Sequence, residues 1–115
     1  MDENYQNLAN AIIVRAAKDY RASRTYLKKH PKTDELVEAA ALQKERRKKR
    51  REKREELGLP KVEERKTPEE RQLSRILHAE RMLDDTERFF RSAWFRKLTD
   101  LDGNIILKRL EEEFA

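Results

Sequence analysis

The part of the sequence with the clearest chemical potential is a run of basic residues near its middle. Positions 44 to 54 read KERRKKRREKR, with nine basic and two acidic residues and a net charge of +7. The whole chain carries +5, so the remaining residues sum to −2. Cations at this density can neutralise several phosphates at once and release their counterions. The run therefore predicts a polyanion-binding surface made of Lys44, Arg46, Arg47, Lys48, Lys49, Arg50, Arg51, Lys53 and Arg54.

Two other interpretations of this run need to be weighed. A solvated helix held by pairs such as Glu45 with Lys49 is one alternative, but such helices usually carry evenly mixed charge. A basic-zipper protein is excluded, because it needs a heptad of leucines directly after the basic region. Here Gly58 and Pro60 interrupt the chain instead. The expected partner is thus nucleic acid, or an acidic groove of a protein complex that binds nucleic acid.

Asp100-Leu101-Asp102-Gly103-Asn104 resembles part of a calcium-binding loop. When Gly103 is aligned with the invariant glycine of such a loop, Leu98 takes the first ligand position and Arg109 that of the bidentate glutamate. Neither side chain can serve there. We therefore expect Asp102 to cap a helix and not to bind a metal.

Other catalytic or metal-binding patterns are missing from the sequence. There is no cysteine, and the two histidines, His30 and His78, are not part of a metal-binding motif. The two glycines, Gly58 and Gly103, cannot form a phosphate-binding loop. We accordingly expect no catalytic residues, no metal and no cofactor, which indicates a protein that is not an enzyme.

The composition predicts an all-α fold. Charged residues make up 44% of the chain, with only two glycines and three prolines, and such a composition favours long helices. A first helix is expected over residues 3–29, with one apolar face, and His30-Pro31 should end it. That face comprises Tyr5, Leu8, Ile12, Ala16, Tyr20, Ser23 and Leu27. We expect a small bundle of three main helices in a single domain, residues 1–115.

A second helix should start at the N-cap Thr33 and carry the basic run. No apolar residue occurs from Gln43 to Glu56, so this part of the helix cannot enter a core. We expect a projecting, highly basic arm that is solvent-exposed, or that becomes ordered on binding. Gly58 and Pro60 should end it, and a charged linker follows. Residues 43–66 thus form the exposed helix end and linker.

Three helix starts are expected after the linker. Thr67-Pro68-Glu69-Glu70 has the pattern of a capping box with proline in the first turn, and predicts a helix to about Arg91. Ser92 should cap a short helix, and Asp102 a final one. An aromatic cluster is the predicted core where the first, third and last helices meet, with Trp94 in a structural role. Its members are Phe89, Phe90, Trp94 and Phe95.

Two segments resemble small helical proteins encoded by prophages and other mobile elements of Gram-positive bacteria. One is AIIVRAAKDYR at residues 11–21; the other is FFRSAWFRKLTDLDG at residues 89–103. In the proteins that this chain resembles, the two segments lie closer together. The resemblance therefore implies a mobile-element context, and it implies that the interval with the basic run is an insertion.

These expectations combine into a functional hypothesis. The N-terminal residues lack the pattern of a signal peptide and no apolar run approaches the roughly 20 residues that cross a bilayer, so we expect a cytoplasmic protein of the bacterial host cell that does not engage the membrane. We expect a phage protein that inhibits a host defence nuclease, as anti-CRISPR proteins do. The alternatives are a DNA-binding accessory or regulatory protein of the element, and a structural helix-pairing protein. A homodimer is compatible with each.

Overall fold

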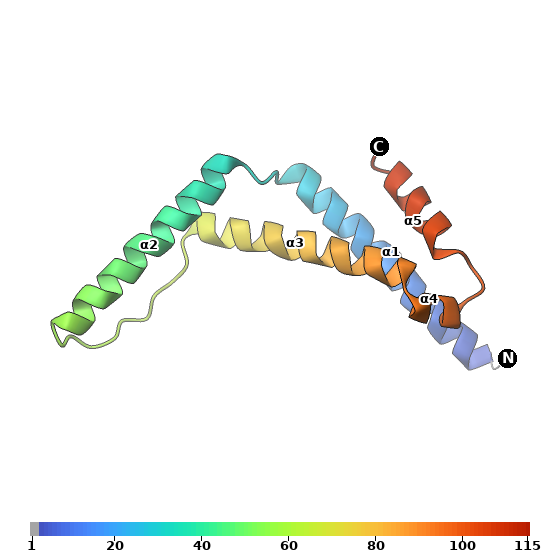
Figure 1. The fold of residues 1–115 in the computed structure, drawn as a ribbon, viewed down its shortest axis with the longest axis horizontal. Coiled ribbons are helices and arrows are strands. Elements are labelled where there is room, and N and C mark those ends of the chain that lie inside the picture. Colours follow the sequence, from blue (N-terminus) through green and yellow to red (C-terminus); the bar gives the residue numbers. More distant parts are fainter. Residues whose placement is uncertain (1–2) are drawn as a thin grey trace. The chain divides into compact units, whose positions relative to one another are not determined.

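The structure is a computed structural model that describes residues 3–115. These residues contain five helices and no strand, which confirms the predicted all-α class (Figure 1). Three of the helices are long. The bounds are α1, Glu3–Lys29; α2, Asp34–Glu56; α3, Pro68–Arg91; α4, Ala93–Leu98; and α5, Gly103–Glu112. No described helix is both long and apolar enough to cross a membrane.

The chain divides into two compact units. The terminal unit combines the chain up to Lys29 with His78–Ala115, and the central unit is His30–Leu77. Helix α3 contributes to both, because its first ten residues belong to the central unit and the rest to the terminal unit. The terminal unit thus contains α1, α4 and α5, whereas the central unit contains α2 and the linker that leads from α2 to α3.

The helix starts follow the predicted caps. The Thr33 hydroxyl accepts a hydrogen bond from the backbone N–H of Leu36 at 3.2 Å, and the Ser92 hydroxyl accepts one from that of Phe95 at 3.1 Å. The Asp102 carboxylate accepts one from the Asn104 N–H at 2.9 Å. Each cap satisfies a backbone donor that lacks a partner within its own helix. Helix boundaries are therefore set by residues close in sequence.

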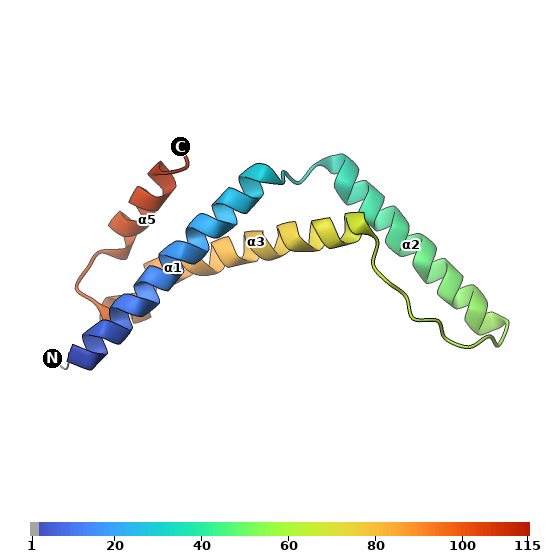
Figure 2. The same ribbon diagram turned by 180° about the vertical axis from the view of Figure 1, so that it is seen from behind.

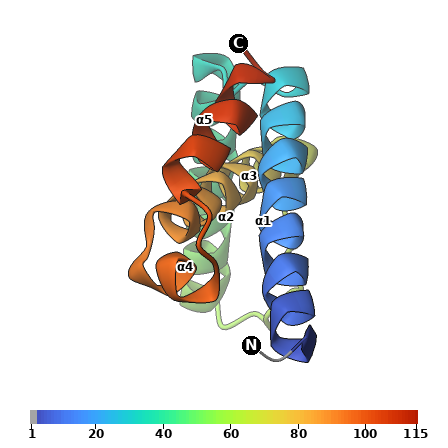
Figure 3. The same cartoon turned by 90° about the vertical axis from the view of Figure 1, so that its right-hand side faces the viewer.

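An aromatic core holds the terminal unit together. Buried residues from α1, α3, α4 and α5 form one cluster, and α5 lies alongside α1 (Figure 3). The Phe89 ring packs edge-on against Phe95, with 5.5 Å between ring centroids. Such aromatic pairs add stabilisation beyond their buried area. The cluster comprises Ile13, Tyr20, Phe90, Phe95, Leu107 and Leu110.

Two predictions for this core were wrong. Trp94 is 55% exposed, and its ring makes an edge contact with Phe89, which packs against the cluster. Leu8 is 60% exposed, whereas Ala9 and Ile13 are buried, so the buried face of α1 is offset by one residue at its start. Ala9 lines a hollow together with Lys97 and Leu98 of α4.

Gly103 is the position where the terminal unit tolerates no side chain. It begins α5 directly against the backbone of α3. A Cβ atom at this position would lie 1.8 Å from the carbonyl oxygen of Phe90 and 3.1 Å from the Phe95 ring. Glycine is therefore required here by close backbone approach. This contact fixes the start of α5 against the aromatic core.

In the central unit, Gly58 reverses the chain at the end of α2. Its φ of 67° lies in the left-handed region, which glycine adopts without strain. The Gly58 N–H donates to the Glu55 carbonyl at 3.1 Å, and the Leu59 N–H donates to the Arg54 carbonyl at 3.0 Å. This is the hydrogen-bond pattern of a Schellman motif. The linker then returns along α2 to the start of α3 (Figure 2).

Candidate polyanion-binding surface

Helix α2 has one buried face, and the side chains on this face change from apolar to polar along the helix. Its buried and half-buried residues are spaced three, four or seven positions apart, so they lie on one face of the helix. Ala40 is only 5% exposed, whereas the second half of the face consists of polar and charged side chains. The face comprises Leu36, Ala39, Ala40, Gln43, Arg47 and Arg54. The basic part of α2 is thus held by polar contacts.

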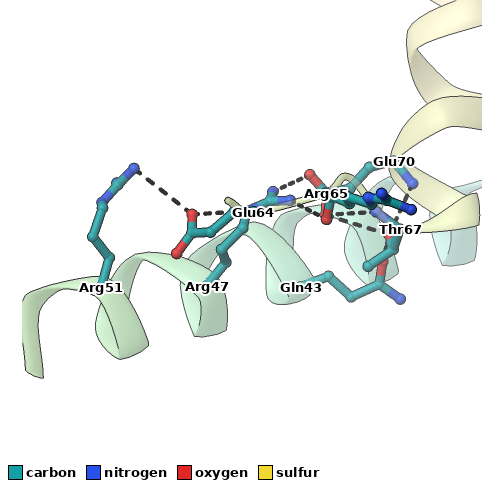
Figure 4. A network of polar contacts seen from close by, with 7 residues as sticks. All are labelled: Gln43, Arg47, Arg51, Glu64, Arg65, Thr67 and Glu70. Carbon is teal, nitrogen blue, oxygen red and sulfur yellow. Dashed lines mark hydrogen bonds and ion pairs between the residues drawn. The ribbon is translucent and has the colours of Figure 1, made fainter. Parts of the chain in front are cut away.

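Arg47 is the centre of these contacts (Figure 4). Its guanidinium group forms a salt bridge with the Glu70 carboxylate, lies 3.8 Å from the Glu64 carboxylate, and donates to the backbone carbonyl of Arg65 at 3.3 Å. The Arg47 side chain is only 15% exposed and that of Glu70 only 9%. One arginine therefore joins α2 to both the linker and the first turn of α3.

The Arg47–Glu70 contact changes the pKa of both groups. The hydrogen bond from Arg47 lowers the pKa of the Glu70 carboxyl below its ordinary value of 4.5, although desolvation opposes the change. The same hydrogen bond raises the pKa of Arg47. Hydrogen bonding to a charged form favours that form. The pair is therefore fully ionised at neutral pH.

Thr67 adds a second connection at the start of α3. Its hydroxyl accepts a hydrogen bond from the Glu70 N–H at 3.2 Å, and its own N–H donates to the Glu70 carboxylate at 3.4 Å. These reciprocal bonds form the predicted capping box. The Thr67 hydroxyl also donates to the side-chain carbonyl of Gln43 on α2. The cap of α3 is thereby bonded to α2 (Figure 4).

The far end of α2 is held more loosely. Arg54 donates to the backbone carbonyl of Pro60 at 2.9 Å and is half-buried. Arg51 lies 4.0 Å from the Glu64 carboxylate, and its side chain remains 56% exposed. Exposed ion pairs of this kind contribute little stability. Arg54 therefore belongs to the turn, whereas Arg51 is still available to a partner.

The structure separates the nine predicted site residues into two groups. Arg47 and Arg54 are half-buried and bonded to the linker or α3, so they hold the central unit together. The other seven project from α2 as exposed cations. They are Lys44, Arg46, Lys48, Lys49, Arg50, Arg51 and Lys53. A helix with several exposed cations can contact phosphates or carboxylates on a partner.

Besides a hollow of about 310 Å³ at the far end of α2, which Glu55 and Glu64 help to line, two others lie against α2 within the central unit. One, of about 420 Å³, is lined by Gln43, Arg46, Lys49, Arg50 and Thr67. The other, of about 360 Å³, has an apolar part formed by Val37, Ala41, Leu73 and their neighbours, together with the charged residues Lys44, Arg47, Lys66 and Glu70. Of these two, the first is the more basic, because no carboxylate lines it.

Within residues 3–115, no group of three or more histidine or acidic side chains is placed to hold a metal ion. Asp102 caps α5 as predicted. No protein-family model, curated protein or solved structure matches this chain. The functional argument therefore depends on α2 and on the residues packed against it.

The sequence did not indicate which residues hold the basic helix in place. Glu64, Thr67 and Glu70 all contact it, Thr67 through Gln43 of α2, but only the Thr67–Glu70 capping box could be recognised from local spacing. A weak signal was present in the linker, where Glu63 and Glu64 interrupt the basic residues. Carboxylates in an otherwise basic linker are suited to pair with an arginine on the helix beside it.

Proposed function

We propose that this is a non-enzymatic binding protein that uses the exposed cations of α2 to engage nucleic acid, or an acidic groove that normally holds nucleic acid. The main support is the presence of seven exposed basic side chains on one helix. Contacts from Arg47 and Gln43 hold that helix against the linker and α3. A helix ordered before binding loses less conformational freedom when it binds, which favours affinity.

A more specific form of this proposal is a mobile-element protein that inhibits a defence nuclease in the cytoplasm of a bacterial host. Its support is the sequence resemblance, the short chain and the confinement of positive charge to α2. In this role the exposed cations would contact guide RNA, target DNA or the acidic channel that binds them. The rival role is a DNA-binding accessory or regulatory protein of the element.

A pull-down from host lysate, with and without added nuclease, separates these roles. A protein target remains bound after nuclease treatment, whereas proteins joined only through nucleic acid are lost. A variant with Arg46, Lys48, Lys49 and Arg50 changed to alanine serves as the control. These four side chains are exposed, so the fold should be preserved. Retention of the same partners by this variant would contradict a role for α2 in either case.

A second candidate, a helix-pairing protein, is favoured by apolar side chains on the surface of the terminal unit. Leu8, Trp94 and Ile105 are each more than half exposed. Exposed apolar groups of this size often mark interaction surfaces when they are contiguous. Sedimentation analysis over a concentration series tests for a homodimer. A dimer that dissociates in a Leu8→Ser/Ile105→Ser variant would support this candidate.

A further inference from the structure

The exposed cations of α2 are not equivalent, and Arg46 and Arg50 differ most from the others. They are four residues apart, so they lie on the same side of the helix on successive turns. Neither has an aspartate or glutamate three or four residues away in either direction. Both are exposed. Their charge is therefore not neutralised by neighbours on α2.

Lys48 and Arg51 lie on another side of α2, where carboxylates accompany the cations. Lys48 has glutamates three residues before and four residues after it. Arg51 has a glutamate four residues after it, and lies 4.0 Å from the Glu64 carboxylate of the linker. Side chains at these spacings are neighbours on a helix surface. The glutamates of α2 at these spacings are Glu45 and Glu52 around Lys48, and Glu55 after Arg51. A phosphate approaching this side meets opposing negative charge.

The hollow beside Arg46 and Arg50 supports this difference. It is lined only by basic and neutral polar residues, and two of them, Gln43 and Thr67, are bonded to each other. Their hydrogen bond joins α2 to the start of α3 at the hollow. Lys49 completes the lining. A phosphate in the hollow would therefore meet Arg46 and Arg50 with no carboxylate in the lining, whereas Lys49 has Glu45 four residues before it and Glu52 three residues after it.

The composition of this region indicates the form of nucleic acid. Residues 31–66, which include α2 and the linker, contain no phenylalanine, tyrosine or tryptophan. Proteins that bind single strands usually stack the bases on aromatic side chains. Contacts to a duplex backbone need only cations and hydrogen-bond donors, and they do not read the base sequence. The basic side of α2 is therefore suited to a duplex.

We propose that the side of α2 carrying Arg46 and Arg50 binds the phosphate backbone of duplex nucleic acid without sequence preference. The opposing side, with Lys48 and Arg51, contributes little. This inference rests on the proposed function, and it names both the ligand and the face of the helix that binds it.

Fluorescence anisotropy with a labelled DNA duplex of arbitrary sequence, at salt concentrations from about 50 to 200 mM, tests this inference. The Arg46→Gln/Arg50→Gln variant should reduce the slope of log affinity against log salt by about 1.8, because each lost phosphate contact removes about 0.9. At about 0.15 M salt its affinity should fall on the order of 30-fold. The matched control Lys48→Gln/Arg51→Gln removes the same charge and should lose less than half as much slope.

Two further measurements define the ligand. The Arg46→Lys/Arg50→Lys variant retains both charges and should keep the wild-type slope. A single strand of the same sequence should bind more weakly than the duplex at every salt concentration. Circular dichroism of each variant checks that the helices are retained.

The outcomes separate this inference from the proposed function. If both double glutamine variants lose the same salt slope, the assignment of binding to the Arg46–Arg50 side of α2 is wrong. The proposal that α2 binds a polyanion would still stand. Tighter binding of the single strand would overturn the assignment of the ligand. If the wild-type protein binds no DNA or RNA duplex, the inference fails, and only an acidic protein groove remains within the proposed function.

Discussion

The terminal unit and the central unit are stabilised by different kinds of contact. In the terminal unit, buried aromatic and aliphatic side chains from four helices meet around Phe90 and Phe95. In the central unit, Arg47 and Gln43 connect α2 to the linker and to α3 through hydrogen bonds and ion pairs. Apolar burial involves no titrating group, whereas ionic contacts are weakened by salt and by protonation of the carboxylate. We therefore predict that the contacts of the central unit can open without unfolding the aromatic core.

The largest effect is expected from Gly103→Ala. The added Cβ would overlap the Phe90 carbonyl, so α5 must move away from the core. We expect a loss of more than about 3 kcal/mol in the free energy of unfolding, as for severe overpacking. Urea unfolding followed by Trp94 fluorescence measures it, because the only tryptophan lies in the terminal unit.

Gly58→Ala is the matched control in the central unit. Nothing lies within 4 Å of the added Cβ, so only the left-handed backbone conformation is penalised, by about 1–2 kcal/mol. This change should leave the Trp94 transition in place and increase hydrogen exchange around the turn. A loss at Gly58 as large as that at Gly103, seen by Trp94 fluorescence, would show that the two units unfold together.

Arg47→Gln should release the linker, because it removes the contacts to Glu64, Arg65 and Glu70 together. Hydrogen-exchange mass spectrometry should show loss of protection in the first turn of α3 and at the basic end of α2. Arg46→Gln, one residue away and exposed, should change neither. Equal effects of the two variants would mean that the charge of α2, and not the Arg47 contacts, controls the linker.

Lowering the pH should weaken the contact between Arg47 and Glu70 step by step, whereas the Arg47→Gln substitution removes it completely. Since the folded-state pKa of Glu70 is below 4.5, its ionised form stabilises the central unit above about pH 4.5, and this contribution disappears as the pH falls through the lowered pKa. An NMR titration of the linker amides follows this change. In Glu70→Gln the linker shifts should lose the titration that is coupled to this carboxyl.

The terminal unit provides an internal comparison for the titration. Arg21 donates to both carboxylate oxygens of Glu113, at 2.8 and 2.9 Å. These hydrogen bonds lower the pKa of Glu113, as Arg47 lowers that of Glu70. Protonation of Glu113 should free this exposed pair without opening the aromatic core. If Trp94 fluorescence changes together with the Glu113 titration, then the aromatic core does depend on ionic contacts, contrary to our prediction.

The smallest effect is expected from Tyr20→Phe. The Tyr20 side chain is fully buried, and its hydroxyl has no hydrogen-bond partner among the described residues. Burial raises the pKa of this hydroxyl. Removing an unsatisfied polar group can be neutral or stabilising, so we expect a gain of up to about 1 kcal/mol. Thermal unfolding measures it, and a clear loss of stability would indicate that the hydroxyl is hydrogen-bonded.

Local features of the sequence were sufficient to predict the helices. Thr33, Thr67, Ser92 and Asp102 each cap a helix through a residue two or three positions away, so their role can be recognised from spacing alone. The five helices follow from these caps and from the breaks at His30-Pro31 and Gly58. The all-α class was predictable for the same reason.

The arrangement of the central unit was not predictable in the same way. Arg47 and Glu70 are 23 residues apart, and nothing local distinguishes Arg47 from the eight other cations of the run. The return of the linker selects it, since that return brings Glu64 and Glu70 to one face of α2. Trp94 illustrates the same limit, because membership of an aromatic cluster does not determine which ring lies at its edge.

The contact between Gly103 and the Phe90 carbonyl also has an evolutionary consequence. Any residue other than glycine would force the two helices apart, so this position should resist substitution even when its neighbours diverge. Descendants of a common ancestor should therefore keep a glycine thirteen residues after the second phenylalanine of the pair. This spacing offers a criterion for recognising distant homologues after the rest of the sequence has changed.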